Sequence, residues 1–135
     1  AELRNHLARR RCDRTIVEST VVRLKELGYL DDAAFASHWR EARERLSPRG
    51  ARSLRRELLG KGLSREIAEE AVMGGMTDEE NAWRAAEQRS RRLAAADYST
   101  FRKKLTAFLE YRGFPSDVVR STVQRAWDSR EAGAE

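Results

Sequence analysis

Residues 54–72 read LRRELLGKGLSREIAEEAV, a pattern that predicts two short helices joined by a glycine turn. Leu54 and Leu58 are four residues apart and therefore share one face of the first helix. Gly62 follows where a residue of positive φ would end that helix, because glycine adopts this conformation without steric cost. Ser64 can cap the second helix through its hydroxyl oxygen, and an apolar face follows it.

The same pattern recurs at a spacing of 51 residues, in a central, a C-terminal and an N-terminal copy. The central copy has Leu54, Leu58, Gly62, Leu63, Ile67 and Ala71. The C-terminal copy has Leu105, Leu109, Gly113, Phe114, Val118 and Thr122. The N-terminal copy has Leu3, Leu7, Arg11, Cys12, Ile16 and Thr20. Three copies at one spacing predict an all-α protein made of tandem helical modules, an extended array of small cores that are each buried against a neighbour.

Three helices complete each predicted module. In the second module they are expected at 32–46, 49–60 and 64–73. The first module is expected to lack its first helix, because Leu3 already lies inside a repeat. The predicted modules are residues 1–30 (incomplete), 31–76 and 77–130, followed by a frayed polar tail at 131–135.

Asp31 and Asp32 precede an apolar stripe and are predicted to cap the helix that carries it. Capping explains both carboxylates better than acid–base chemistry or a metal, since no third ligand lies at a useful spacing. The stripe is Phe35, Trp39, Ala42 and Leu46, and Trp83 holds the position of Phe35 in the next module. We expect these aromatic side chains and Trp127 to pack in the core rather than stack on bases. For Tyr29 and Tyr111, near the module junctions, packing is also favoured over the alternative that they are exposed for a partner.

The composition limits the function. A net charge of +5 favours an acidic partner, either nucleic acid or a carboxylate-rich protein surface. No apolar run is long enough to span a bilayer, and the lone Cys12 suits a reducing cytoplasm. His6 and His38 form no zinc-binding set with one cysteine, and phosphate loops and nucleophile elbows are missing from the sequence. We therefore predict no catalysis, no metal and no cofactor.

Basic residues recur on the glycine-ended helix of each copy. The central set is Arg49, Arg52, Arg55, Arg56 and Lys61, of which Arg49, Arg52 and Arg56 are expected on one helix face. The C-terminal set is Arg102, Lys103, Lys104 and Arg112, and the N-terminal set is Arg4, Arg9, Arg10 and Arg14. Stacked modules would join them into a stripe for phosphates or for a carboxylate-rich protein surface. The alternative is a solvated face paired with nearby glutamates, which we favour for the run Arg84, Arg89, Arg91 and Arg92 around Glu87.

Three motifs together resemble the RecX family, bacterial regulators of the recombinase RecA. They are Gly28-Tyr29-Leu30-Asp31-Asp32, Leu58-x-x-Lys61-Gly62-Leu63…Ile67, and Leu109-x-x-Arg112-Gly113-Phe114…Val118. The resemblance covers nearly the whole chain and departs from the family at Arg11, which holds a glycine position. It implies tandem three-helix modules in an elongated, curved molecule, either right-angled or arc-like. Such proteins lie in the groove of the RecA–DNA filament, where they suppress strand exchange, ATP hydrolysis and coprotease activity.

Two functions follow as expectations. The first is a monomeric, cytoplasmic regulator that binds RecA and its single-stranded DNA filament through several modules, with weak direct DNA binding, in DNA repair, recombination and the SOS response. The second is a general DNA-binding helical protein that acts without a recombinase. Its affinity for bare DNA would be tight and steeply salt-dependent, whereas a charge of only +5 favours the first function.

Overall fold

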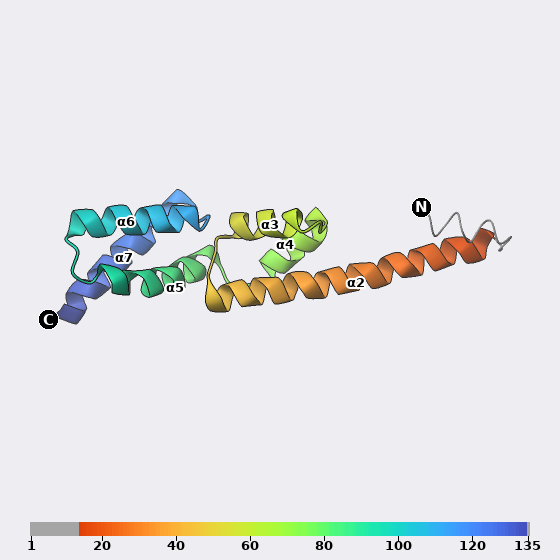
Figure 1. Cartoon of the computed structure of the whole chain (residues 1–135), viewed down its shortest axis with the longest axis horizontal. Helices are drawn as coiled ribbons and strands as arrows, with labels where there is room; N and C mark the ends of the chain where they lie inside the picture. Colours follow the sequence, from red (N-terminus) through yellow and green to blue (C-terminus); the bar gives the residue numbers. More distant parts are fainter. Residues whose placement is uncertain (1–13, 135) are drawn as a thin grey trace. The chain divides into compact units, whose positions relative to one another are not determined.

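The computed structural model describes residues 14–134, and within them all side chains except those of residues 14–18, 20, 21, 25 and 131–134. This described part contains helices and no strand, so the all-α prediction is confirmed. The elements are α2 (Arg14–Leu46), α3 (Ala51–Gly60), α4 (Arg65–Met73), α5 (Asp78–Ser90), the 3-10 helix η1 (Arg91–Leu93), α6 (Tyr98–Tyr111) and α7 (Ser116–Ala134) (Figure 1). Contacts divide the chain after Phe35, and we describe the parts on either side of this residue separately.

Helix α2 is continuous through the segment where a new helix was predicted to begin. Asp31 and Asp32 lie exposed inside it, so the prediction that they cap a helix is wrong. No proline interrupts residues 14–46, and a glycine or aspartate inside a helix costs only about 1 kcal/mol or less. Phe35 is 45% exposed, so its predicted place in the core is also wrong.

The turn between α3 and α4 has the predicted structure. Gly62 has a φ of 86°, and the amide of Leu63 donates to the carbonyl oxygen of Leu58 across it. Ser64 caps α4 by accepting a 3.2 Å hydrogen bond from the amide of Ile67. The buried apolar residues here are Ala36, Leu54, Leu58, Leu63, Ile67, Ala68, Ala71 and Val72.

The same turn recurs between α6 and α7, where Gly113 has a φ of 87°. Thr77 and Asp97 cap α5 and α6 through their side-chain oxygens. The core is formed by Ala82, Ala85, Ala86, Leu93, Phe101, Leu105, Leu109, Phe114, Val118, Val119, Val123 and Ala126. Trp83 and Trp127 pack against this core, half-buried, as predicted.

Two expectations concern the ends of the chain. Helix α7 extends to Ala134, so the backbone of residues 131–134 is helical. The prediction of a frayed tail from residue 131 is wrong for these residues. In the N-terminal copy Leu3, Leu7, Arg11 and Cys12 lie outside the described residues. Ile16 and Thr20 lie within α2, and their side chains are among those not described.

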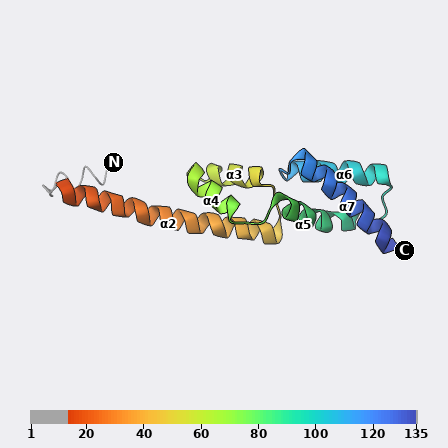
Figure 2. The same ribbon diagram turned by 180° about the vertical axis from the view of Figure 1, so that it is seen from behind.

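The end of α6 meets the start of α3 (Figures 1 and 2). The amide of Gly50 donates a 2.8 Å hydrogen bond to the carbonyl oxygen of Arg112. Two carboxylates add to this junction: Asp78 accepts from the amide of Ala51, and Glu44 accepts from the amide of Met76. Hydrogen bonds to main-chain groups thus connect the helices before residue 74 with those after it.

Candidate partner-binding surface

On α3 two of the predicted binding residues are open to a partner. Arg52 and Arg56 are exposed, and neither forms an ion pair or side-chain hydrogen bond within residues 36–130. Arg49 was expected on the same helix face, but α3 begins only at Ala51 and Arg49 lies in the segment before it. The expected single face of three arginines is therefore wrong, and its exposed part is Arg52 and Arg56.

Arg55 is held by a carboxylate of the neighbouring helix. Its Nε and Nη2 donate to the two carboxylate oxygens of Glu69 on α4, at 2.6 and 3.0 Å. This hydrogen bonding raises the pKa of Arg55 and lowers the pKa of Glu69, although burial acts against both shifts. A partner would have to compete with a bidentate pair to bind Arg55.

Lys61 is also engaged, by an aromatic ring. Its Nζ lies 4.1 Å from the centroid of the Trp39 ring, the geometry of a cation–π contact. Helix α3 has 10 residues and therefore spans about 15 Å. Arg49 precedes this helix and Lys61 follows it, yet both side chains reach one pair of neighbours, because Arg49 lies near Glu57 and Glu57 accepts a hydrogen bond from the Trp39 ring that Lys61 covers.

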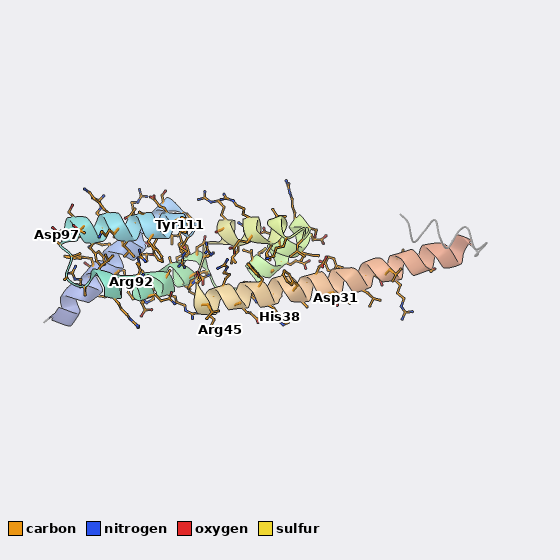
Figure 3. The ribbon with its side chains drawn as sticks, in the orientation of Figure 1. Asp31, His38, Arg45, Arg92, Asp97 and Tyr111 are labelled. Atoms are coloured by element: carbon orange, nitrogen blue, oxygen red, sulfur yellow. The ribbon has the colours of Figure 1, made fainter. Side chains whose placement is uncertain are left out.

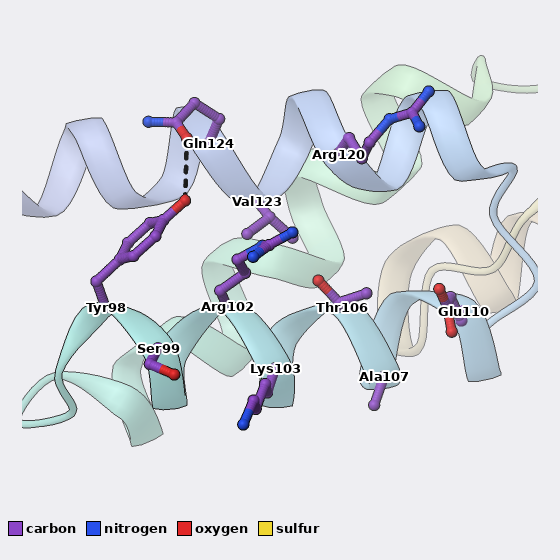
Figure 4. Close-up of a pocket in the computed structure, with 10 residues that line it drawn as sticks. All are labelled: Tyr98, Ser99, Arg102, Lys103, Thr106, Ala107, Glu110, Arg120, Val123 and Gln124. Carbon is purple, nitrogen blue, oxygen red and sulfur yellow. Dashed lines mark hydrogen bonds between the residues drawn. The ribbon is translucent and has the colours of Figure 1, made fainter.

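On α6 the basic residues border a groove against α7. Arg102, Lys103 and Lys104 are exposed. Arg102 and Lys103 line a hollow of about 870 Å³ between the helices, which α7 completes with Arg120 (Figure 4). Glu110 is the one carboxylate among its lining residues in the described part of the chain. The groove is positively charged overall, and Arg120 is a member that sequence reasoning missed because it lies outside the repeat motif.

Arginines gather at the junction of the modules. Arg43 binds Glu57 with two nitrogens, Nε at 3.1 Å and Nη2 at 2.7 Å, and Trp39 donates to the same carboxylate. The Nε of Arg49 lies 3.6 Å from Glu57, beyond hydrogen-bond distance, and is buried with no acceptor among the described residues.

Arg112 joins this group from α6. Its Nη1 donates to the carbonyl oxygen of Pro48 at 3.1 Å, and its Cζ lies 4.6 Å from the ring centroid of Phe108. Arg89 of α5 approaches the same ring at 5.0 Å, which contradicts its assignment to a solvated face. Burial lowers the pKa of Arg112, and the positive charges of Arg49, Arg43 and Arg89 lower it further.

The exposed aromatic residue of this region is Tyr111, at the end of α6 (Figure 3). Its side chain is 77% exposed, so the expectation that it packs is wrong. Trp39 is half-buried and donates to Glu57, and Trp127 contacts Tyr98 and Phe101 edge to face. Tyr111 is therefore the aromatic ring near Arg112 that a partner reaches most easily.

Within the described residues no group of three or more His, Cys, Asp or Glu side chains is placed to hold a metal ion. His38 is exposed on α2 (Figure 3). Among the helices described, none combines the length and apolar character needed to cross a membrane.

Comparison with protein families gives two matches in this part of the chain. Residues 31–72 match the second three-helix domain of RecX, and residues 77–123 match its third three-helix domain. The chain is similar to the regulatory protein RecX of Chlorobium phaeobacteroides, with 35% identity over 128 residues that cover 95% of this chain and 83% of that protein. It is 34% identical to the regulatory protein RecX of Chlorobaculum tepidum over 92% of this chain and 76% of that protein.

A solved structure shares the fold. The crystal structure of RecX from Lactobacillus salivarius superposes with a TM-score of 0.64 and covers 93% of this chain and 82% of that one. The sequence identity in this comparison is 22%, so it speaks for the fold alone.

Proposed function

Because the chain belongs to the RecX family of regulatory proteins, we propose that it is a non-catalytic regulator of the recombinase RecA. In this proposal it binds RecA and the RecA–single-stranded DNA filament, lies in the filament groove, and inhibits recombinase, ATPase and coprotease activity. It would thereby modulate DNA repair, homologous recombination and the SOS response, acting in the cytoplasm as a monomer without a cofactor.

The observation that carries this proposal is the presence of exposed cations on both glycine-ended helices. Arg52 and Arg56 are open on α3, and Arg102, Lys103 and Lys104 are open on α6. A filament repeats the same surface, so it suits a protein that presents similar cations on successive modules. Several weak contacts then add up to an avidity that one module lacks.

The proposed contact residues differ in how they would act. The proposal keeps the full set, namely Arg49, Arg52, Arg55, Arg56, Lys61, Arg102, Lys103, Lys104 and Arg112. Arg52 and Arg56 are the first to test, because they have no carboxylate partner in the described structure. Arg55 and Lys61 are held by Glu69 and Trp39, which makes them secondary.

The test is the charge reversal Arg52→Glu with Arg56→Glu, measured as inhibition of the RecA ATPase on single-stranded DNA. We expect the concentration for half-inhibition to rise about tenfold or more, while the circular dichroism spectrum stays unchanged. The matched control reverses Arg91 and Arg92, exposed arginines of η1 outside the proposed surface. Equal inhibition by both double variants would remove α3 from the interface.

A second function, direct DNA binding without a recombinase, is favoured by the basic groove between α6 and α7. Binding to bare single-stranded DNA and to the same DNA coated with RecA, at physiological salt, separates the two. Much tighter binding to the coated DNA supports the regulator. Equal binding to both would mean that the cations recognise phosphate and that the chain shares the fold of the family without this activity.

A further inference from the structure

Four arginines converge at the module junction with one carboxylate among them. Arg43 is in the last turn of α2, and Arg49 lies just before α3. Arg89 is on α5, and Arg112 directly follows α6. Glu57 is the carboxylate, and both its oxygens already accept hydrogen bonds, one from Arg43 and one from Arg43 and Trp39 together. The cluster, named here the junction arginines, thus carries a net charge of about +3 in a partly buried place.

Such a concentration of like charge is unfavourable without a counter-ion. Arg112 has no carboxylate within hydrogen-bond distance in the described structure; its guanidinium donates to a neutral carbonyl and stacks on Phe108. The buried Nε of Arg49 has no acceptor there. Guanidinium groups in this state bind an oxyanion with charge-assisted, often bidentate hydrogen bonds.

We propose that the junction arginines form a binding site for a backbone phosphate of single-stranded nucleic acid. The site gathers donors from elements on both sides of the junction, so it exists only when the helices before and after residue 74 are assembled. This inference deepens the second function named above, direct binding of DNA, by assigning it a site, and it does not require RecA.

Two neighbouring features favour nucleic acid over an acidic protein segment. Tyr111, adjacent to Arg112, exposes 77% of its side chain and offers a ring for base stacking. Proteins that bind single strands combine such rings with cations that follow the backbone. Lys104 and Phe108 are four residues apart on α6, and Arg112 comes four residues later, directly after the helix ends, so the exposed Lys104 extends the positive charge along this side of α6.

The test measures the binding of fluorescein-labelled oligo-dT by fluorescence anisotropy at several salt concentrations. We expect Arg49→Gln and Arg89→Gln each to weaken binding about tenfold and to reduce the salt slope by about one. Tyr111→Ala should weaken it by a similar factor through lost stacking. Arg92→Gln is the matched control, an exposed arginine outside the cluster, and is expected to change affinity less than about twofold.

Arg112→Gln alone would not suffice, because this residue also binds Pro48 and its loss can alter the junction. A second measurement therefore uses pyrophosphate as the probe in thermal unfolding. Pyrophosphate should raise the melting temperature of the wild-type chain more than that of Arg49→Gln or Arg89→Gln, since a ligand that binds the folded state stabilises the protein.

Two results would overturn the proposal. One is that Arg49→Gln and Arg89→Gln bind oligo-dT with the same affinity as the control Arg92→Gln. The other is unchanged oligo-dT affinity together with weaker binding to RecA, which would assign the cluster to protein carboxylates. Failure of the proposed function would give a different result. The wild-type chain would then bind oligo-dT normally but would not inhibit the RecA ATPase.

Discussion

The amide nitrogen of Gly50 donates a 2.8 Å hydrogen bond to the carbonyl oxygen of Arg112, which joins the start of α3 to the end of α6. The approach is so close that a Cβ on Gly50 would collide with the carbonyl oxygen of Gly113. A Cβ on Gly113 would in turn lie 2.6 Å from the Cβ of Ser53. The helices before and after residue 74 therefore meet backbone to backbone, at two residues that have no side chain.

Gly50→Ala should destabilise the protein by about 1–3 kcal/mol, because the new methyl group has to displace main-chain atoms. Urea denaturation followed by circular dichroism measures this loss. The matched control is Gly60→Ala, at the end of α3, where a Cβ would meet nothing within 4 Å. We expect that substitution to be neutral or to stabilise by up to about 1 kcal/mol. Similar free energies of unfolding for the two variants would contradict the close contact.

Gly62 and Gly113 end equivalent helices with nearly the same φ, 86° and 87°, but their surroundings differ. Nothing lies within 4 Å of a Cβ on Gly62, so Gly62→Ala should cost only the left-handed strain of about 1–2 kcal/mol. Gly113→Ala adds the collision with Ser53 and should cost at least about 1 kcal/mol more. The measurement is the difference between their urea midpoints at equal slope, and equal midpoints would refute the argument.

The local turn chemistry was predictable from sequence because each turn is specified within a few residues. The positive φ predicted at the helix-ending glycines is found at Gly62 and Gly113, and Ser64 caps α4 as predicted. The continuity of α2 was missed, since Asp31 and Asp32 carry the signature of a helix start and yet lie in a helix interior. Residues that are favoured at the start of a helix do not break one, so a helix without a proline can continue through them.

The candidate surface was less predictable, because its pairing depends on how helices pack. Arg55 with Glu69 and Arg43 with Glu57 are both 14 residues apart in sequence, which is no helical spacing. Gly50 and Gly113 meet across an even longer separation. Spacing within a helix identifies a basic face, whereas the carboxylates that neutralise it come from other helices and appear only in the folded chain.

Leu58 and Leu59 are neighbours with opposite environments. The side chain of Leu58 is fully buried and that of Leu59 is 41% exposed. Leu58→Ala should therefore cost about 2–5 kcal/mol, through lost burial and a cavity, and Leu109→Ala should behave alike. Leu59→Ala, the control, should cost less than about 1 kcal/mol. Thermal unfolding of the three variants checks this, and a Leu59→Ala loss as large as that of Leu58→Ala would contradict the burial.

Asp97 links the stability of α6 to pH. Its Oδ1 accepts a 2.8 Å hydrogen bond from the amide of Thr100, and this bond lowers the pKa of the carboxyl group from its ordinary value of 3.8. A lowered folded-state pKa means that the charged form stabilises the fold above the unfolded pKa, and that this contribution is lost as the pH falls through the folded pKa.

Asp97→Ala should therefore lower the melting temperature at neutral pH, and its difference from the wild type should shrink below pH 3.8. Asp97→Asn is the matched control, because the amide oxygen still accepts from Thr100 but does not titrate. Its melting temperature should lie between those of the wild type and Asp97→Ala at neutral pH. Melting curves from neutral pH to about pH 3 measure both effects. A gap between Asp97→Ala and the wild type that stays constant over this range would show that the cap acts without its charge.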